Sequence, residues 1–232
     1  MATTDDISRR AIFRKSWLLL IVWNLFLAVI MFVPAGIHWT LGWLFLAVFT
    51  IYTVLSCWYL WRVNPEIFVA RSKVHQGTKS WDKVLMVLLL ASFLAIFVTA
   101  ALDARFGWSL VSIPVIVVGY VLFTVGFAGS IWVYAVNKFA EPSVRIQRDR
   151  EQKVIDTGPY AIVRHPLYAA SVVLIAGTAL ALGSYWAFVP GAVGTLVMVV
   201  RIVLEDRTLQ DELEGYKAYA SRTPYRLVPG VW

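Results

Sequence analysis

Six runs of apolar residues constrain this chain more than any other feature of its sequence. They lie at residues 17–37, 41–61, 84–102, 110–136, 167–182 and 185–203. A helix that crosses a bilayer needs about 20 consecutive, mainly apolar residues, and it satisfies its backbone hydrogen bonds internally. The chain is 59% hydrophobic and 15% charged, whereas about a quarter of the residues in a soluble domain are charged. We therefore expect an all-α integral membrane protein with about six transmembrane helices.

Only Gly183-Ser184 separates the last two apolar runs, which predicts a short, tight helical hairpin. The first of these runs is near the lower length limit for a span. Two alternatives therefore remain: the hairpin crosses the whole bilayer, or it stops short of the far side. Small residues in the fourth run, such as Gly126, are typical of closely packed membrane helices. We expect one membrane domain over residues 1–232. It would have four spans in residues 1–136, and a connector (residues 137–166), hairpin and tail in residues 137–232 that form the catalytic core.

Lysine and arginine are concentrated in four polar segments, at residues 1–16, 62–83, 137–166 and 201–226. The links at residues 36–40, 103–109 and 183–184 contain one arginine between them. With six spans, every basic segment lies on the same side as both termini, which is the positive-inside pattern. We expect both termini and the active site to face the cytoplasm, at the inner membrane if the chain is bacterial. The same pattern explains the +7 net charge, so no nucleic-acid partner is expected.

The basic segment 62–83 also contains the apolar residues Ile67, Phe68 and Val69. Two interpretations of this stretch remain open. It can form a short amphipathic helix that lies in the membrane interface, or it can be a solvated loop.

Two polar clusters stand at the cytoplasmic ends of the hairpin. The connector ends in Asp156–Tyr168, DTGPYAIVRHPLY, and the last apolar run passes into a charged stretch. In that stretch Arg201, Glu205, Tyr216 and Tyr219 belong to a pattern of three- and four-residue steps, which predicts one continuous helix with these residues on one face. Because the two helices of a hairpin begin and end on the same side, we expect the connector and Glu205 to lie close together.

Each of these residues also has an ordinary interpretation. Arg201 and Glu205 can form an ion pair one helical turn apart, and His165 can bind local backbone. Tyr216 and Tyr219 can anchor the chain at the membrane interface. Two unusual polar clusters at one membrane surface favour a functional site over these separate roles.

Three motifs carry a resemblance to a known family. They are G-P-Y-A-I-V-R-H-P-L-Y at 158–168, R-x-x-x-E-D at 201–206 and G-Y-K-A-Y…P-Y-R-L-V-P-G-V-W at 215–232. Together they resemble the isoprenylcysteine carboxyl methyltransferase family, which is similar to the phospholipid N-methyltransferases. The resemblance covers roughly residues 120–232, and the first three spans carry no motif that we can assign.

The resemblance implies an integral-membrane methyltransferase that uses S-adenosylmethionine and acts on a lipophilic acceptor from the bilayer. Arg201, Glu205 and His165 would be catalytic, and no metal is implied. The residues that would bind the cofactor are Tyr160, Arg164, His165, Pro166, Tyr168, Glu205, Tyr216 and Tyr219.

Further positions follow from the same resemblance. Asp206 replaces the second residue of the family's Glu-Glu pair, which leaves the role of this position open. The run Arg226–Pro229 would close the pocket from the tail, and Asn137 and Lys138 are weaker candidates.

The residue types suit methyl transfer from this cofactor. S-adenosylmethionine carries its own electrophile, so the protein has to supply positioning and electrostatics. A carboxylate such as Glu205 can accept hydrogen bonds from ribose hydroxyls or contact the cofactor's ammonium group. Arg164 suits the cofactor carboxylate and Arg201 an acceptor carboxylate. Tyr160 and Tyr168 offer aromatic surface, and His165 can serve as a base for an amine or thiol.

The acceptor expected first is the carboxylate of an isoprenoid or prenylcysteine-like compound. A phospholipid amine and a thiol are alternatives. A different class is an NADPH-dependent sterol or enone reductase, in which Arg145, Arg148 and Arg150 would clamp the nucleotide phosphate. A transporter or scaffold is disfavoured, because the spans carry almost no ionisable residue near mid-membrane.

Overall fold

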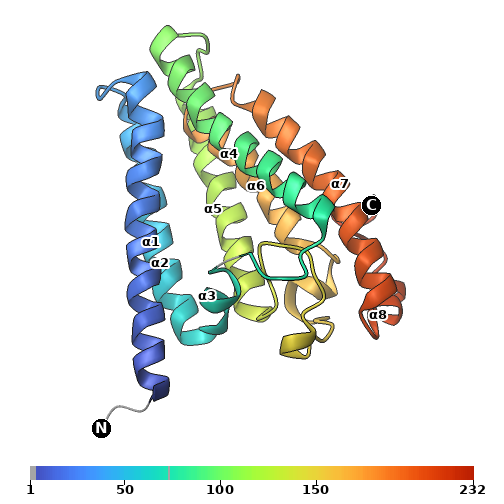
Figure 1. Ribbon diagram of the computed structural model, residues 1–232. Helices are drawn as coiled ribbons and strands as arrows, with labels where there is room; N and C mark the ends of the chain where they lie inside the picture. The colour runs from blue at the N-terminus through green and yellow to red at the C-terminus, as the bar shows by residue number, and fades with distance from the viewer. Residues whose placement is uncertain (1–3, 73) are drawn as a thin grey trace.

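The computed structural model describes residues 4–72 and 74–232, with side chains from residue 13 onward. The side chains of residues 1–12 and Lys73, which belong to two of the basic segments, lie outside the described residues. The helices are α1 (Thr4–Ala35), α2 (Thr40–Val63), α3 (Glu66–Ala70), α4 (Ser80–Phe106), α5 (Ile113–Val136), α6 (Pro166–Ala181), α7 (Phe188–Glu212) and α8 (Tyr216–Arg222), with 3₁₀ turns η1 (Arg148–Arg150) and η2 (Gly158–Ala161) (Figure 1).

The membrane-spanning class predicted from the apolar runs is confirmed. Within the described residues, five helical segments are long and apolar enough to cross a bilayer: Phe13–Ala35 of α1, α2, α4, α5 and α7. The sixth helix, α6, has 16 residues and is shorter than these. The protein therefore has five to six spans, and α6 is the helix on which the number depends.

The predicted tight pairing of the two hairpin helices is not the main contact of either one. α6 packs most extensively along α5, and α7 packs most extensively along α4. Gly126 on α5 lies so close to α6 that an added Cβ would come within 2.6 Å of the Leu174 nitrogen, and a Cβ on Gly177 would overlap the backbone of Phe123. The close approach expected at Gly126 is thus confirmed, because small residues let the two backbones meet.

The predicted continuous helix after the last span is wrong. α7 ends at Glu212, and Gly215 adopts a φ of +80° before α8 begins. This left-handed conformation is accessible to glycine at little cost, and it redirects the chain. Tyr216 and Tyr219 therefore lie on a separate helix from Arg201 and Glu205.

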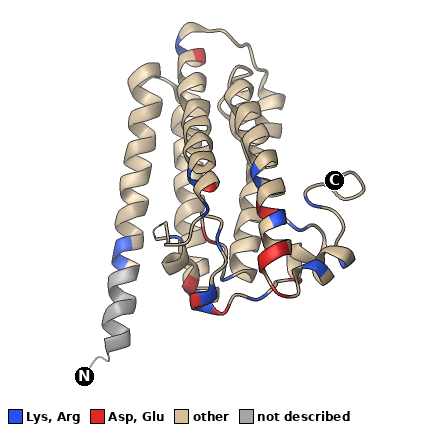
Figure 2. Cartoon of the chain, turned by 45° about the vertical axis from the view of Figure 1, so that its right-hand side comes forward, with Lys and Arg blue, Asp and Glu red and all other residues tan. Residues whose placement is uncertain are grey.

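The basic segment between α2 and α4 contains the short helix α3, in which Ile67 and Ala70 are buried. Most of the charged residues lie at the end of the bundle that carries α3, α8 and the connector (Figure 2). At the opposite end, Asp103 is buried and accepts hydrogen bonds from the hydroxyls of Ser109 and Ser184. The buried carboxylate thus joins the end of α4 to the link between α6 and α7.

Candidate functional site

A cavity of about 890 Å³ lies between the helices and extends to the connector, whose residues form part of its wall. Its wall inside the bundle is mainly apolar, with Leu20 and Trp23 from α1, Phe93 from α4 and Met198 from α7. Its wall toward the connector is mixed and contributes polar residues such as Asn137, Gln147 and Arg164 beside apolar ones. A mainly apolar pocket with a few convergent polar groups is the usual form of a small-molecule site, and this one has an apolar and a more polar section.

The structure brings all nine of the predicted site residues to this one cavity. They come from the connector, α6, α7 and α8, and are Tyr160, Arg164, His165, Pro166, Tyr168, Arg201, Glu205, Tyr216 and Tyr219. Asn137 also lines the cavity, whereas Lys138 and the run Arg226–Pro229 are not part of its wall. The tail run therefore does not close the pocket in the way that the resemblance implied.

Glu205 is a carboxylate that lines the cavity. The Tyr168 hydroxyl of α6 donates a hydrogen bond to its Oε2 at 2.6 Å, which fixes the orientation of the carboxylate. Glu205 is half-buried, and its Oε1 accepts no hydrogen bond from a described residue. One oxygen is thus held by the protein, and the other remains for a ligand.

Asp206 is the next residue along α7 and is completely buried. The Arg164 guanidinium grips it in a bidentate pair, with Nε 2.9 Å from Oδ1 and Nη2 3.1 Å from Oδ2. His165 Nε2 lies 3.3 Å from Oδ1, and Tyr216 and Arg226 also donate to this carboxylate. Asp206 is therefore the anion that gathers the connector, α7 and the tail, a role that its position beside Glu205 did not reveal.

Arg164 is fully engaged by this arrangement. Its Nη1 donates to the carbonyl oxygens of Thr223 and Pro224, both at 2.8 Å. The backbone nitrogens of Arg164 and His165 donate to the carbonyls of Tyr225 and Arg226, both at 2.9 Å. Each guanidinium nitrogen thus has a protein acceptor, and the side chain holds the tail against the connector.

Arg201 is also held by a carboxylate, one that the sequence analysis missed. Its Nε lies 2.6 Å from Asp82 Oδ1, and its Nη2 donates to Asp82 Oδ2 at 3.1 Å and to the Pro142 carbonyl at 2.7 Å. Asp82 is in the first turn of α4 and also accepts a hydrogen bond from the Val144 backbone nitrogen at 2.6 Å. The signal for it was an acidic residue at the start of a membrane helix, where the helix dipole favours negative charge.

Three tyrosines fix the wall formed by the connector and tail. The Asn137 amide donates to the Tyr160 hydroxyl at 2.7 Å, and the Tyr219 hydroxyl donates to the Tyr160 carbonyl at 2.8 Å. Burial raises the pKa of Tyr160 and of Tyr219, and for Tyr216 the nearby Asp206 carboxylate adds to the effect of burial on its pKa. All three phenols therefore remain protonated and neutral at physiological pH.

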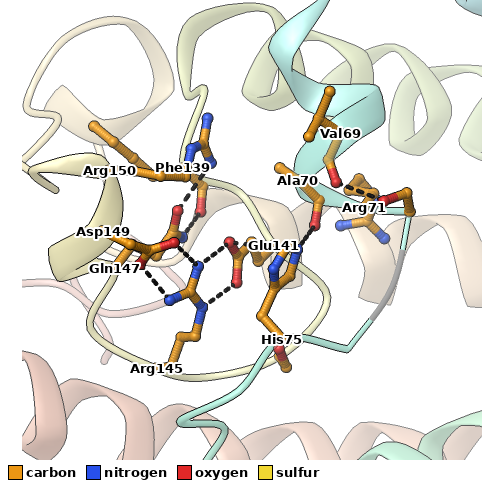
Figure 3. A network of polar contacts seen from close by, with 12 residues as sticks. Val69, Ala70, Arg71, His75, Phe139, Glu141, Arg145, Gln147, Asp149 and Arg150 are labelled. Atoms are coloured by element: carbon orange, nitrogen blue, oxygen red, sulfur yellow. Dashed lines mark hydrogen bonds and ion pairs between the residues drawn. The ribbon is translucent and has the colours of Figure 1, made fainter. Parts of the chain in front are cut away.

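The arginines considered as a nucleotide-phosphate clamp are largely paired inside the protein. Arg145 binds Glu141 and Asp149, which raise its pKa, and Arg150 binds Gln147 and Glu66 (Figure 3). Arg148 alone of the three is exposed without a carboxylate partner among the described residues. This network braces the connector, and it weakens the case for a reductase.

One comparison with known proteins finds a related family. Residues 114–214 match the model of the phospholipid methyltransferase family, which the sequence resemblance named only as a similar group. A search of curated proteins found no match. The matched region runs from α5 through α7 and contains the connector, the close pair α5 and α6, and both Arg201 and Glu205. This match over residues 114–214, in a chain with several membrane-spanning helices, identifies a membrane methyltransferase that uses S-adenosylmethionine.

Proposed function

We propose that the chain methylates a lipophilic acceptor whose apolar part occupies the bundle section of the cavity and whose head reaches Glu205. The observation that carries this proposal is the continuity of the cavity. One space joins the apolar residues of α1, α4 and α7 to the polar connector. A lipid can then place its reacting atom beside a polar cofactor without leaving the bilayer.

The residues at the polar end fit S-adenosylmethionine. The free oxygen of Glu205 can accept hydrogen bonds from ribose hydroxyls or bind the cofactor's ammonium group. Tyr160, Tyr168 and His165 present aromatic rings to the same space, and such rings attract a sulfonium cation. The cofactor supplies the electrophilic methyl group, so the protein's task is to bind, orient and exclude water. In this arrangement Arg164 and Tyr216 form part of the cavity wall, and their hydrogen bonds to Asp206 hold them in place.

The charges around the cavity support an amine as the methyl acceptor. The charge of Arg201 is offset by Asp82 at 2.6 Å, whereas Glu205 forms no direct ion pair with a described residue and interacts with Arg201 only at longer range. The carboxylate attracts an ammonium head and repels a second carboxylate. We therefore place the amine of a phospholipid-like acceptor first. Glu205 and His165 would be the groups that take up the proton released by the nitrogen.

An isoprenoid or prenylcysteine-like carboxylate is the second candidate. Arg201 lines the cavity, and its Nη1 makes no hydrogen bond with a described residue. This nitrogen can donate to an acceptor carboxylate, as the sequence resemblance implies. A thiol acceptor has no separate observation in its favour.

We also propose that the polar end of the cavity faces the cytoplasm and that residues 1–232 act as one domain. The support is the concentration of lysine and arginine at the end of the bundle that carries the connector and α8 (Figure 2). Loops rich in these residues stay on the cytoplasmic side. In a bacterial cell this places the protein in the inner membrane.

Calorimetric titration of the detergent-purified protein with S-adenosylhomocysteine tests the cofactor site, with NADPH as the control ligand. We expect binding of the first compound only. Absence of binding by protein shown to be folded would overturn the proposal.

The acceptor atom is tested by incubating membranes with methyl-labelled S-adenosylmethionine and treating the labelled lipid with alkali. An N-methyl group is stable to alkali, whereas a methyl ester is hydrolysed. Alkali-stable label is expected, and release of the label as methanol would move the carboxylate acceptor to first place.

A further inference from the structure

The cations that line the cavity fall into two groups. Arg145, Arg164 and Arg201 are each paired with a carboxylate of the protein. Lys15 and Arg71 line the same cavity but have no carboxylate partner among the residues that the structure describes, and the same is true of Lys153. Because a paired cation has most of its charge offset, only the second group has charge left for an anionic ligand.

Arg71 is the member of this group whose position is fixed. Its guanidinium carbon lies 4.7 Å from the centre of the Tyr134 ring, and its Nη1 donates to the Ala140 carbonyl at 3.2 Å. Both partners also line the cavity. These contacts orient the guanidinium without adding negative charge, so that Nε and Nη2 stay available. The side chain is exposed, which means that a ligand can reach it.

The surroundings of Arg71 match the head of a membrane lipid. It follows α3, whose Ile67, Phe68 and Val69 line the cavity beside it. The α1 residues Lys15 and Trp23 also line the cavity. An arginine above an apolar surface, at the cytoplasmic end of a helix bundle, is the arrangement that binds anionic lipid head groups.

We propose that Arg71 forms a subsite for the phosphate of a phospholipid acceptor. Its guanidinium presents parallel N–H donors, which match two oxygens of a phosphodiester. This inference rests on the proposed function, because it assigns the phosphate of the lipid whose amine would reach Glu205. The phosphate would then lie at Arg71 and the amine near Glu205. Each charge of a zwitterionic head group would thus lie beside an opposite charge of the protein.

The test measures binding to the full-length protein in detergent, saturated with S-adenosylhomocysteine. The probe is dihexanoyl phosphatidylethanolamine, a soluble short-chain lipid, titrated by calorimetry. Arg71→Gln removes the positive charge and the pair of parallel N–H donors. A charge-assisted hydrogen-bond pair is worth enough that its loss weakens binding about tenfold or more. Arg71→Lys keeps the charge without the pair of parallel donors, and we expect an intermediate affinity.

Arg62 offers a matched control. It is exposed, its guanidinium lies 3.7 Å from the centre of the Trp58 ring, and it is not part of the cavity wall. Arg62→Gln should leave lipid binding unchanged. All the variants should bind S-adenosylhomocysteine as the wild type does, and unchanged thermal unfolding in detergent shows separately that they are folded.

The possible outcomes separate this subsite from the cofactor site. Wild-type affinity of Arg71→Gln for the lipid, or no binding of the lipid by the wild type, would overturn the proposal. A loss of S-adenosylhomocysteine affinity in folded Arg71→Gln would overturn it too, because the arginine would then bind the cofactor carboxylate. If the wild type binds the lipid through Arg71 but does not bind S-adenosylhomocysteine, the subsite stands and the proposed function fails.

Discussion

Arg201 of α7 and Asp82 of α4 form a buried ion pair in which Nε lies 2.6 Å from Oδ1. The same two residues hold the connector, because Asp82 accepts from the Val144 nitrogen and Arg201 donates to the Pro142 carbonyl. One pair thus joins two membrane helices and the connector. Arg201, for which a role at the acceptor is expected, therefore also holds α4, α7 and the connector together.

Asp82→Asn should destabilise the protein strongly. The substitution leaves the Arg201 guanidinium buried without its counter-charge, and loss of one partner of a buried pair costs about 3–5 kcal/mol. The measurement is unfolding of the purified protein in detergent by denaturant. Glu212→Gln is the control, since it breaks the partly exposed pair with Lys79, and such pairs contribute about 1 kcal/mol or less. Equal losses in the two variants would contradict the assignment.

Asp206→Asn should loosen the C-terminal tail. Arg164 and Arg226 lose the carboxylate that binds them, so the segment that follows α8 loses its attachment to the connector. We expect trypsin to cleave after Arg222 many times faster than in the wild type, and S-adenosylhomocysteine to bind more weakly. The exposed Asp211 provides the control as Asp211→Asn. Unchanged proteolysis in Asp206→Asn would show that other contacts hold the tail.

Glu205→Gln should weaken cofactor binding with little effect on stability. Glu205 is half-buried and makes one hydrogen bond with the described residues, to Tyr168, so the fold depends on it less than on Asp206. Loss of a charge-assisted hydrogen bond to the cofactor reduces affinity by about tenfold or more. Titration with S-adenosylhomocysteine measures this, with the exposed Glu214→Gln as the matched control. Wild-type affinity would remove Glu205 from the cofactor site.

Gly177→Ala should disturb the contact between α5 and α6. The added Cβ would overlap the backbone nitrogen of Phe123, which cannot move without the helix, and overpacking costs about 1–3 kcal/mol or more. At Gly129 the added Cβ would meet only the Ala170 side chain, at 3.2 Å, so Gly129→Ala should cost less. Thermal unfolding in detergent compares the two variants. A larger loss at Gly129 would contradict the observed packing.

The positions of the helices could be predicted from the sequence because hydrophobic length decides them. A run of about 20 apolar residues has one stable conformation in a bilayer, and α2 and α5 lie within a few residues of the predicted runs. The residues of the candidate site could also be grouped, since short links return successive helices to one side of the membrane. Gly215 was visible in the sequence, but the polar pattern around it continued past the end of α7.

What the sequence determined by itself is thus the class of the protein, the approximate positions of its spans and the set of residues that meet at the cavity. The tertiary structure decided which charges remain available to a ligand. Asp82 and Arg201 are far apart in the chain, as are Arg164 and Asp206. A charge is offset by whichever opposite charge the packing of helices brings within hydrogen-bond distance, and no local pattern records that choice. Packing therefore left Glu205 and Arg71 unpaired among the described residues, while it paired Arg164 and Arg201.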